Sequence, residues 1–100
     1  MHGFRLTDGK GFHITFKNGW TISVQFGPGN YCDNYNMDIM SFRSSKDYGR
    51  VESFTAEIAF WGPDGEMQKF GDPSDEYRDT VKGRVTPEEV LAVMADIARR

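Results

Sequence analysis

The chain has 100 residues and a mass of 11.4 kDa, a length that suits one domain with one hydrophobic core. Aromatic residues make up 14% of it and Cys32 is its single cysteine, which excludes an intrinsically disordered chain, a disulfide-stapled scaffold and a cysteine-rich zinc finger. The formal net charge of −3 argues against a protein that follows a nucleic-acid backbone by bulk electrostatics.

The charge is spread unevenly along the chain. Residues 1–50 hold six bases and four acids, a net charge of +2, whereas residues 51–100 hold six bases and eleven acids, a net charge of −5. We therefore expect no bulk nucleic acid as a partner, but a local anion site in the first half stays open. Because the chain has neither a long apolar run nor a signal-peptide pattern, we also expect a soluble, cytoplasmic protein without a membrane partner.

A short leading strand is expected around Phe4 and Leu6, followed by a clearer pattern from Gly11 to Gly27. In that second segment apolar and polar side chains alternate in two runs, which predicts two β-strands joined by a turn. The apolar side chains of the two runs are Phe12, Ile14, Phe16, Trp20, Ile22, Val24 and Phe26.

The turn between these strands fixes their register. A three-residue loop of Lys17-Asn18-Gly19, with Gly19 in the left-handed conformation, pairs Ile14 with Ile22 and gathers the apolar side chains on one face. That face is predicted to be core. The other face carries short polar side chains: His13, Thr15, Thr21, Ser23 and Gln25.

The segment from Gly27 to Asn36 is an unusual loop, rich in glycine, asparagine and tyrosine. Glycines let a backbone approach a ligand, asparagines offer paired donors and acceptors, and tyrosines offer a flat face with a polar tip, a set that suits a planar heterocycle with hydroxyls or phosphates. The alternative is a structured turn whose tyrosines fill the edge of the core. The candidate ligand-binding residues are Asn30, Tyr31, Asn34 and Tyr35.

A basic cluster follows the loop. Arg43, Lys46 and Arg50 lie around serine and tyrosine residues, and such a cluster can receive phosphate through charge-assisted hydrogen bonds. It can equally be a solvated loop, after a short strand or edge segment over Met37 to Arg43. If the loop and the cluster meet, they supply base stacking and phosphate neutralisation together.

A second hairpin is predicted from Phe54 to Phe70. Alternating side chains lead into Gly62-Pro63-Asp64-Gly65, a type I turn with proline at its second position. This register sets Ile58 opposite Phe70 in the core and pairs Trp61 with Met67 on the outer face, where they need a cover. Trp61 and Met67 are therefore the candidate interface residues.

The chain is predicted to end in a helix, after a polar surface loop from Gly71 to Gly83 in which a short extended segment around Val81 stays open. Thr86 is the expected N-cap, Pro87 the first helical residue, and Glu89 completes a capping box. The stripe expected to pack on the sheet consists of Val90, Leu91, Met94, Ile97 and Ala98. The fold class is thus α+β, a four- or five-stranded antiparallel sheet with one C-terminal helix packed on it, in a single domain covering residues 1–100.

Catalytic and metal sites are not indicated. Gly27-Pro28-Gly29 lacks the spacing of a phosphate-binding loop, and a calcium loop counted from Asp33 lacks its glycine and its closing glutamate. His13 is expected at the surface, and Glu57 has no identifiable partner for acid or base chemistry. Cys32 fits a small buried side chain better than a nucleophile. We expect no catalytic residue, no metal and no cofactor, hence a protein that is not an enzyme.

The segments GF and F-x-NG-x-T-x-SVQFG between Gly11 and Gly27, the GNYC that begins at Gly29, and the later turn and helix start together resemble a pattern in small, mostly uncharacterised proteins encoded by bacteriophages and some bacteria. The resemblance covers most of the chain. It implies a phage context, in which proteins of this size act against host defence by binding a host protein or by sequestering a nucleotide immune signal.

Two functions of different classes follow. In the first, the loop from Gly27 to Asn36 and the basic cluster form a pocket, at an interface of a homo-oligomer, that holds a nucleotide-like anion without converting it. In the second, the protein inhibits a host protein through its exposed sheet face, with Trp61 and Met67 as anchors. A minor virion or assembly component is the third possibility that the sequence leaves open.

Overall fold

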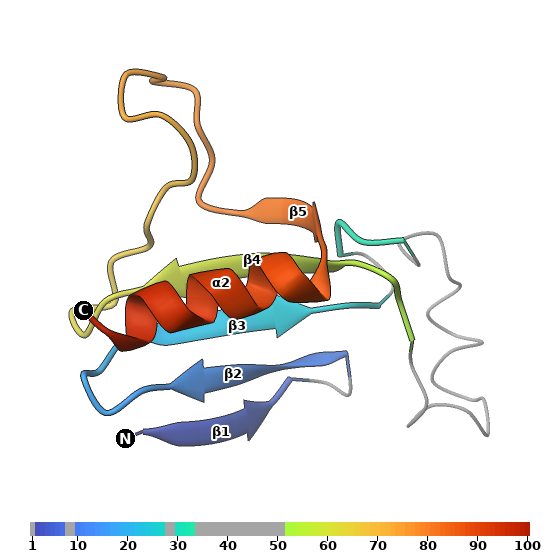
Figure 1. Cartoon of the computed structure of the whole chain (residues 1–100), viewed down its shortest axis with the longest axis horizontal. Coiled ribbons are helices and arrows are strands. Elements are labelled where there is room, and N and C mark those ends of the chain that lie inside the picture. Colours follow the sequence, from blue (N-terminus) through green and yellow to red (C-terminus); the bar gives the residue numbers. More distant parts are fainter. Residues whose placement is uncertain (1, 8–9, 28–29, 34–51) are drawn as a thin grey trace.

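The computed structural model describes residues 2–7, 10–27, 30–33 and 52–100. These residues form one antiparallel sheet whose five strands lie in chain order, and one C-terminal helix (Figure 1). The elements are β1 (Gly3–Leu6), β2 (Gly11–Thr15), β3 (Thr21–Gln25), β4 (Ala56–Trp61), β5 (Lys82–Val85) and α2 (Pro87–Ala98). The predicted α+β fold class is therefore confirmed.

The β2–β3 hairpin has the predicted register. Ile14 lies opposite Ile22, and Gly19 has a φ of 87° in the three-residue loop, where a residue without a Cβ is favoured. The amide of Phe16 donates to the carbonyl of Trp20 at 2.8 Å, which closes the loop. Because the strands pair this way, their apolar side chains share the face on which α2 lies.

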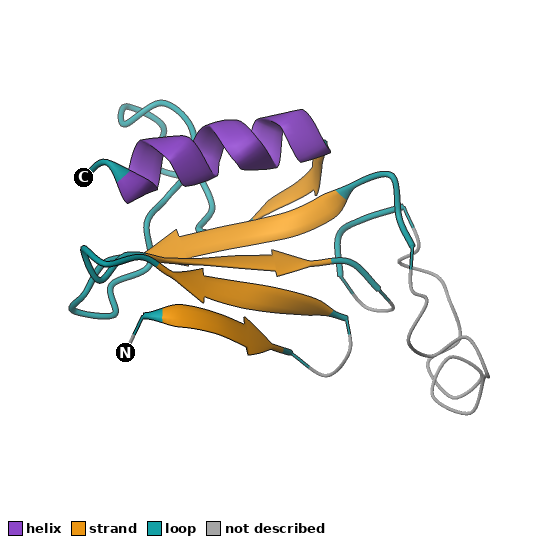
Figure 2. Cartoon of the chain, turned by 60° about the horizontal axis from the view of Figure 1, so that its bottom comes forward, coloured by secondary structure: helices purple, strands orange, loops and turns teal. Residues whose placement is uncertain are grey.

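Helix α2 packs on that face of the sheet (Figure 2). Ile22, Ile58 and Ile97 are 0–1% exposed and form the centre of the core. Phe4 and Leu6 belong to the same face, because they pair with Ile14 and Phe12, yet they are 81% and 82% exposed. One helix thus covers β3 and β4 but leaves the β1 edge open (Figure 1).

Both ends of α2 are held by side chains. Thr86 accepts a hydrogen bond from the amide of Glu89 at 3.3 Å and donates to its carboxylate at 3.1 Å, the capping box expected from the sequence. At the other end, Nδ2 of Asn18 donates to the carbonyls of Ile97 and Arg100 at 2.8 and 3.1 Å. The hairpin loop therefore satisfies helix carbonyls that have no partner within the helix.

The second hairpin is shorter than predicted. Trp61 does pair with Met67, but Ile58 lies opposite Lys82 of β5, so its predicted pairing with Phe70 was wrong. The chain leaves the sheet after Gln68, and Phe70 packs edge-on against Phe60 with ring centroids 5.3 Å apart. Within the predicted surface loop, the extended segment that the sequence left open around Val81 corresponds to the start of β5 at Lys82.

Two positions of the predicted helix stripe and one of the predicted second hairpin are exposed. Leu91 of the helix stripe is 67% exposed, and Ala98 is exposed as well, because Val93 faces the core in their place. Phe54 is 86% exposed because β4 begins only at Ala56.

Met37 to Arg43 and the turn Asp8-Gly9 lie outside the described residues. No helix in the described part of the chain has the length and hydropathy that crossing a bilayer requires.

Candidate functional site

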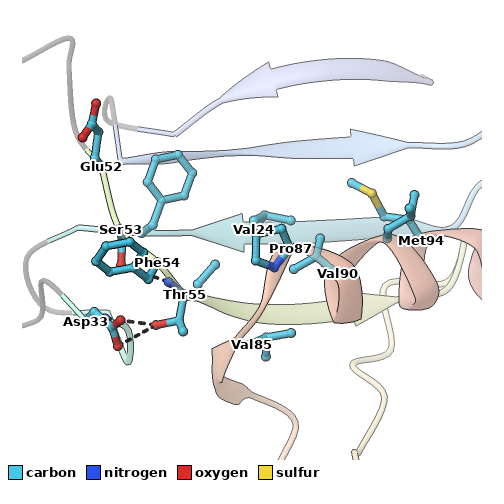
Figure 3. Close-up of a pocket in the computed structure, with 13 residues that line it drawn as sticks. Val24, Asp33, Glu52, Ser53, Phe54, Thr55, Val85, Pro87, Val90 and Met94 are labelled. Atoms are coloured by element: carbon cyan, nitrogen blue, oxygen red, sulfur yellow. Dashed lines mark hydrogen bonds between the residues drawn. The ribbon is translucent and has the colours of Figure 1, made fainter.

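A groove of about 810 Å³ opens where the start of α2 lies over the end of β3 and the start of β4 (Figure 3). Its floor consists of the side chains of Val24, Ala56 and Val85, which are at most 8% exposed. The first turns of α2 form one wall. The other described lining residues are Phe26, Asp33, Glu52, Ser53, Phe54, Thr55, Pro87, Val90, Leu91 and Met94.

The groove is apolar inside and polar at one rim. Phe54 and Leu91, both largely exposed, offer an aromatic ring and an aliphatic side chain to an occupant. The polar groups gather where the chain enters β4, at Asp33 and at residues 52–55. Small-molecule sites commonly combine an apolar interior with a few fixed polar groups.

Hydrogen bonds hold the polar rim in place. The hydroxyl of Thr55 donates to Oδ1 of Asp33 at 2.9 Å and accepts from the amide of Asp33 at 3.1 Å. The guanidinium of Arg84 lies 3.0 Å from the same carboxylate oxygen. Segments far apart in the sequence thus meet at this rim, and a guanidinium lies beside a carboxylate that lines the groove.

The loop bearing Asn30 and Tyr31 is fastened to the neighbouring strands. The amide of Tyr31 donates to the carboxylate of Glu57 at 2.7 Å, and the carbonyl of Tyr31 accepts from the amide of Arg84 at 2.8 Å. A Cβ on Gly83 would lie 2.6 Å from the Cβ of Tyr31, so this position has room only for glycine. The loop is therefore held against β4 and β5.

Within this loop, the side chains differ in burial. Tyr31 is 60% exposed, so it does not fill the core edge as the structured-turn reading expected. The Nδ2 atom of Asn30 is buried and has no hydrogen-bond partner among the described residues, which is costly for an amide donor. Cys32 is fully buried, and the Gly27 amide donates to its Sγ at 3.3 Å. This cysteine has a structural role.

The described residues include two of the predicted ligand-binding residues. Asn30 and Tyr31 lie in the loop that is hydrogen-bonded to β4 and β5. This loop borders the groove rim, because Arg84 contacts both the carbonyl of Tyr31 and the carboxylate of Asp33. The other predicted ligand-binding residues lie outside the described residues, so their meeting with the loop stays a prediction. They are Asn34, Tyr35, Arg43, Lys46 and Arg50.

Sequence reasoning missed the groove and the part that Arg84 plays at its rim. Arg84 lies 51 positions from Asp33, and no local pattern indicates that pairing. Arg84 also has a φ of 54°, which an arginine rarely adopts. The sequence shows Asp33 next to Cys32, but not its partners, which are Thr55 just before β4 and Arg84 of β5.

The predicted interface residues lie on the opposite face of the sheet. Trp61 is half-buried and meets the imidazole of His13 edge-on, with ring centroids 5.2 Å apart. Met67 beside it is 41% exposed and Ala59 is 9% exposed. Trp61 thus lies against its own sheet and also presents surface to solvent.

His13 is the one histidine in this region with a shifted pKa. Partial burial lowers the pKa of His13, and the nearby positive charge of Arg5 lowers it further. Among the described residues, no three histidine, cysteine or acidic side chains come close enough together to hold a metal ion.

Comparison with known proteins adds no assignment. No family model, no curated protein and no solved structure matches this chain. The function is therefore inferred from the groove, its polar rim and the loop that contains Asn30 and Tyr31.

Proposed function

We propose that this protein is a non-catalytic binding protein that sequesters a nucleotide-like small molecule in the groove. The observation that carries the proposal is a groove of about 810 Å³ with aromatic and aliphatic walls, a carboxylate rim and an adjacent guanidinium. Its volume lies within the usual range of small-molecule sites, about 300–1,000 Å³.

Each part of a nucleotide has a matching group. A base packs between the ring of Phe54 and the side chain of Leu91, since both line the groove and are largely exposed. The carboxylates of Asp33 and Glu52 suit ribose hydroxyls, as acidic residues do in dinucleotide sites. A phosphate placed at the rim receives hydrogen bonds from Arg84, whose side chain is 63% exposed.

The side chains around the groove support binding without conversion. Oδ1 of Asp33 already accepts from Thr55 and Arg84, and the thiol of Cys32 is enclosed in hydrogen bonds with Gly27. Glu57 accepts from the Tyr31 amide. In the described part of the chain these groups hold the structure together, so we propose no catalytic role for them.

The resemblance to phage-encoded proteins favours a biological role for this binding during infection. A protein that holds a nucleotide signal made by an infected bacterium lowers the free concentration of that signal, and it needs no turnover to do so. We therefore propose a counter-defence role in the bacterial cytoplasm.

Calorimetric titration with ADP-ribose, cyclic ADP-ribose and cyclic di-AMP tests the proposal. The wild type is expected to bind at least one of them. Phe54→Ala and Arg84→Gln should each weaken that binding by about tenfold or more, since each removes a stacking face or a charge-assisted hydrogen bond.

Matched substitutions elsewhere serve as controls. Tyr77 is 88% exposed, much like Phe54, and Arg99 is an exposed arginine at the end of α2. Tyr77→Ala and Arg99→Gln should bind as the wild type does. Absence of heat with all three probes, or equal losses in the control variants, would contradict sequestration in the groove.

A second candidate function is favoured by Met67, which is 41% exposed next to the half-buried Trp61. An exposed methionine beside a tryptophan is a common anchor of protein interfaces. In this alternative the protein inhibits a host protein through the outer sheet face. Trp61→Ala that folds normally and still captures such a partner undiminished would exclude it.

A further inference from the structure

A second, smaller pocket lies on the sheet face that α2 does not cover. It has a volume of about 280 Å³. Its lining residues are Gly3, Phe4, Arg5, His13, Thr15, Thr21 and Trp61. We call it the polar-face pocket. Four neighbouring strands contribute to it, β1 to β4, so it is built on the rigid part of the fold.

The strand register explains the hollow. Thr15 lies opposite Gly3 on one side and Thr21 on the other, and Thr21 lies opposite Trp61. Gly3 has no side chain, and a Cβ built on it would have no atom within 4 Å, so space stays open above Thr15. The Trp61 ring reaches across to His13 in the next row and forms a wall.

The groups that face this space are donors. The hydroxyls of Thr15 and Thr21 lie 2.9 Å apart and share one hydrogen bond, so one of the two O–H groups keeps its hydrogen for another acceptor. Arg5 is exposed and makes no ion pair with the described residues. Among the described lining residues there is no carboxylate.

We propose that the polar-face pocket binds a small phosphomonoester carried on a planar ring, of which a nucleoside monophosphate is the simplest example. Arg5 and the free threonine hydroxyl hold the phosphate oxygens, and the ring packs against Trp61. The volume of about 280 Å³ lies near the lower limit for small-ligand sites, so the pocket suits a monophosphate rather than a dinucleotide.

Binding at this pocket is linked to the protonation of His13. The charged and titratable residues that line the pocket are Arg5 on β1 and His13 on β2, while β3 and β4 line it with Thr21 and Trp61. In the row of His13, β3 and β4 carry the uncharged Ser23 and Ala59. A bound phosphate adds negative charge beside the imidazole and raises its pKa. By linkage, protonation of His13 strengthens binding as the pH falls, whereas protonation of the phosphate itself, whose second pKa is about 6, opposes it.

Nuclear magnetic resonance follows both walls of the pocket in the intact protein. Titration with 5′-AMP should shift the indole N–H signal of Trp61 and leave that of Trp20, which packs with Phe60 and Arg100 on the helix-covered side. The pKa of His13 should rise by about half a unit or more on saturation. Inorganic phosphate should move His13 but bind more weakly than 5′-AMP.

Variants separate this pocket from the groove. Arg5→Gln should weaken the 5′-AMP binding that shifts the Trp61 signal by about tenfold or more, whereas the control Arg99→Gln should leave it unchanged. The proposal is overturned if 5′-AMP leaves the Trp61 and His13 signals in place, or if Arg5→Gln binds as well as the wild type. A loss with Phe54→Ala instead of Arg5→Gln assigns the ligand to the groove.

Discussion

At the scale of single residues, Cys32 holds together the loop next to the groove. Its side chain is fully buried, accepts from the Gly27 amide at 3.3 Å and donates to the Gly27 carbonyl at 3.6 Å. The thiol thus gives the buried Gly27 amide an acceptor, whereas the Gly27 carbonyl also accepts from the Asn30 amide at 3.2 Å. This explains why a cysteine, small and weakly polar, occupies the position.

Replacing this cysteine should therefore cost stability. Cys32→Ala leaves the buried Gly27 amide without an acceptor and should lower the free energy of unfolding by about 1–3 kcal/mol. Urea denaturation measures the loss. Cys32→Ser keeps a donor and an acceptor and should lose less than Cys32→Ala. The reverse order would show that the thiol acts as a buried apolar group rather than as a hydrogen-bond partner.

His13 makes stability depend on pH. Its pKa in the folded protein is lowered by burial and by Arg5 from the ordinary histidine value of 6.5, so the unfolded chain binds the proton more readily. The His13 contribution to stability is complete above pH 6.5 and is lost as the pH falls through the lower pKa of the folded state.

Thermal unfolding between pH 7.5 and pH 5 measures this effect. The wild type should lose stability towards the acidic end, and His13→Gln should show a smaller loss over the same interval. His2→Gln, which changes an exposed histidine before β1, is the control and should follow the wild type. Parallel curves for all three proteins would contradict the assignment to His13.

At the scale of elements, the β2–β3 loop stabilises two structures at once. The Oδ1 atom of Asn18 accepts from the Trp20 amide at 3.0 Å, while its Nδ2 donates to two carbonyls at the end of α2. Asn18→Ala should lower the free energy of unfolding by about 1–3 kcal/mol, since it removes three hydrogen bonds that are part-buried or exposed.

A carboxylate at this position separates the two roles. Asn18→Asp keeps the acceptor for Trp20 but directs negative charge at the helix carbonyls, so it should be at least as destabilising as Asn18→Ala. Lys17→Ala, an exposed neighbour in the same loop, should change the free energy of unfolding by less than about 0.5 kcal/mol. A stable Asn18→Asp variant would show that the loop does not cap the helix.

The elements with strong local patterns were predictable from the sequence. The β2–β3 register follows from alternation and from Gly19, and the start of α2 follows from Thr86, Pro87 and Glu89. The partner of Ile58 was not, because strand pairing across a long connection is decided by packing rather than by local sequence. The groove was missed for the same reason, since its rim joins Asp33 to Arg84.

At the scale of the whole molecule, one helix on a five-stranded sheet leaves an apolar edge. Phe4 and Leu6 are more than 80% exposed on the helix-covered face of β1, an edge strand that pairs only with β2. Exposed apolar side chains on an edge strand favour association with another chain. This supports the expected homo-oligomer, which we propose to form through β1.

Light scattering measures this association. The wild type should have at least the mass of a dimer, and Phe4→Lys with Leu6→Lys should reduce the mass towards that of a monomer. Tyr77→Lys alters an equally exposed aromatic residue away from β1 and should keep the wild-type mass. A monomeric wild type at high concentration would contradict an assembly through this edge.

The central claim is that the groove holds a nucleotide-like molecule and returns it unchanged. Native mass spectra of the protein saturated with ADP-ribose, cyclic ADP-ribose or cyclic di-AMP, recorded before and after unfolding, test this most directly. We expect an adduct with at least one probe, less abundant in Phe54→Ala, that is released on unfolding with its original mass. No adduct with any probe, or release of a cleaved product, would contradict it.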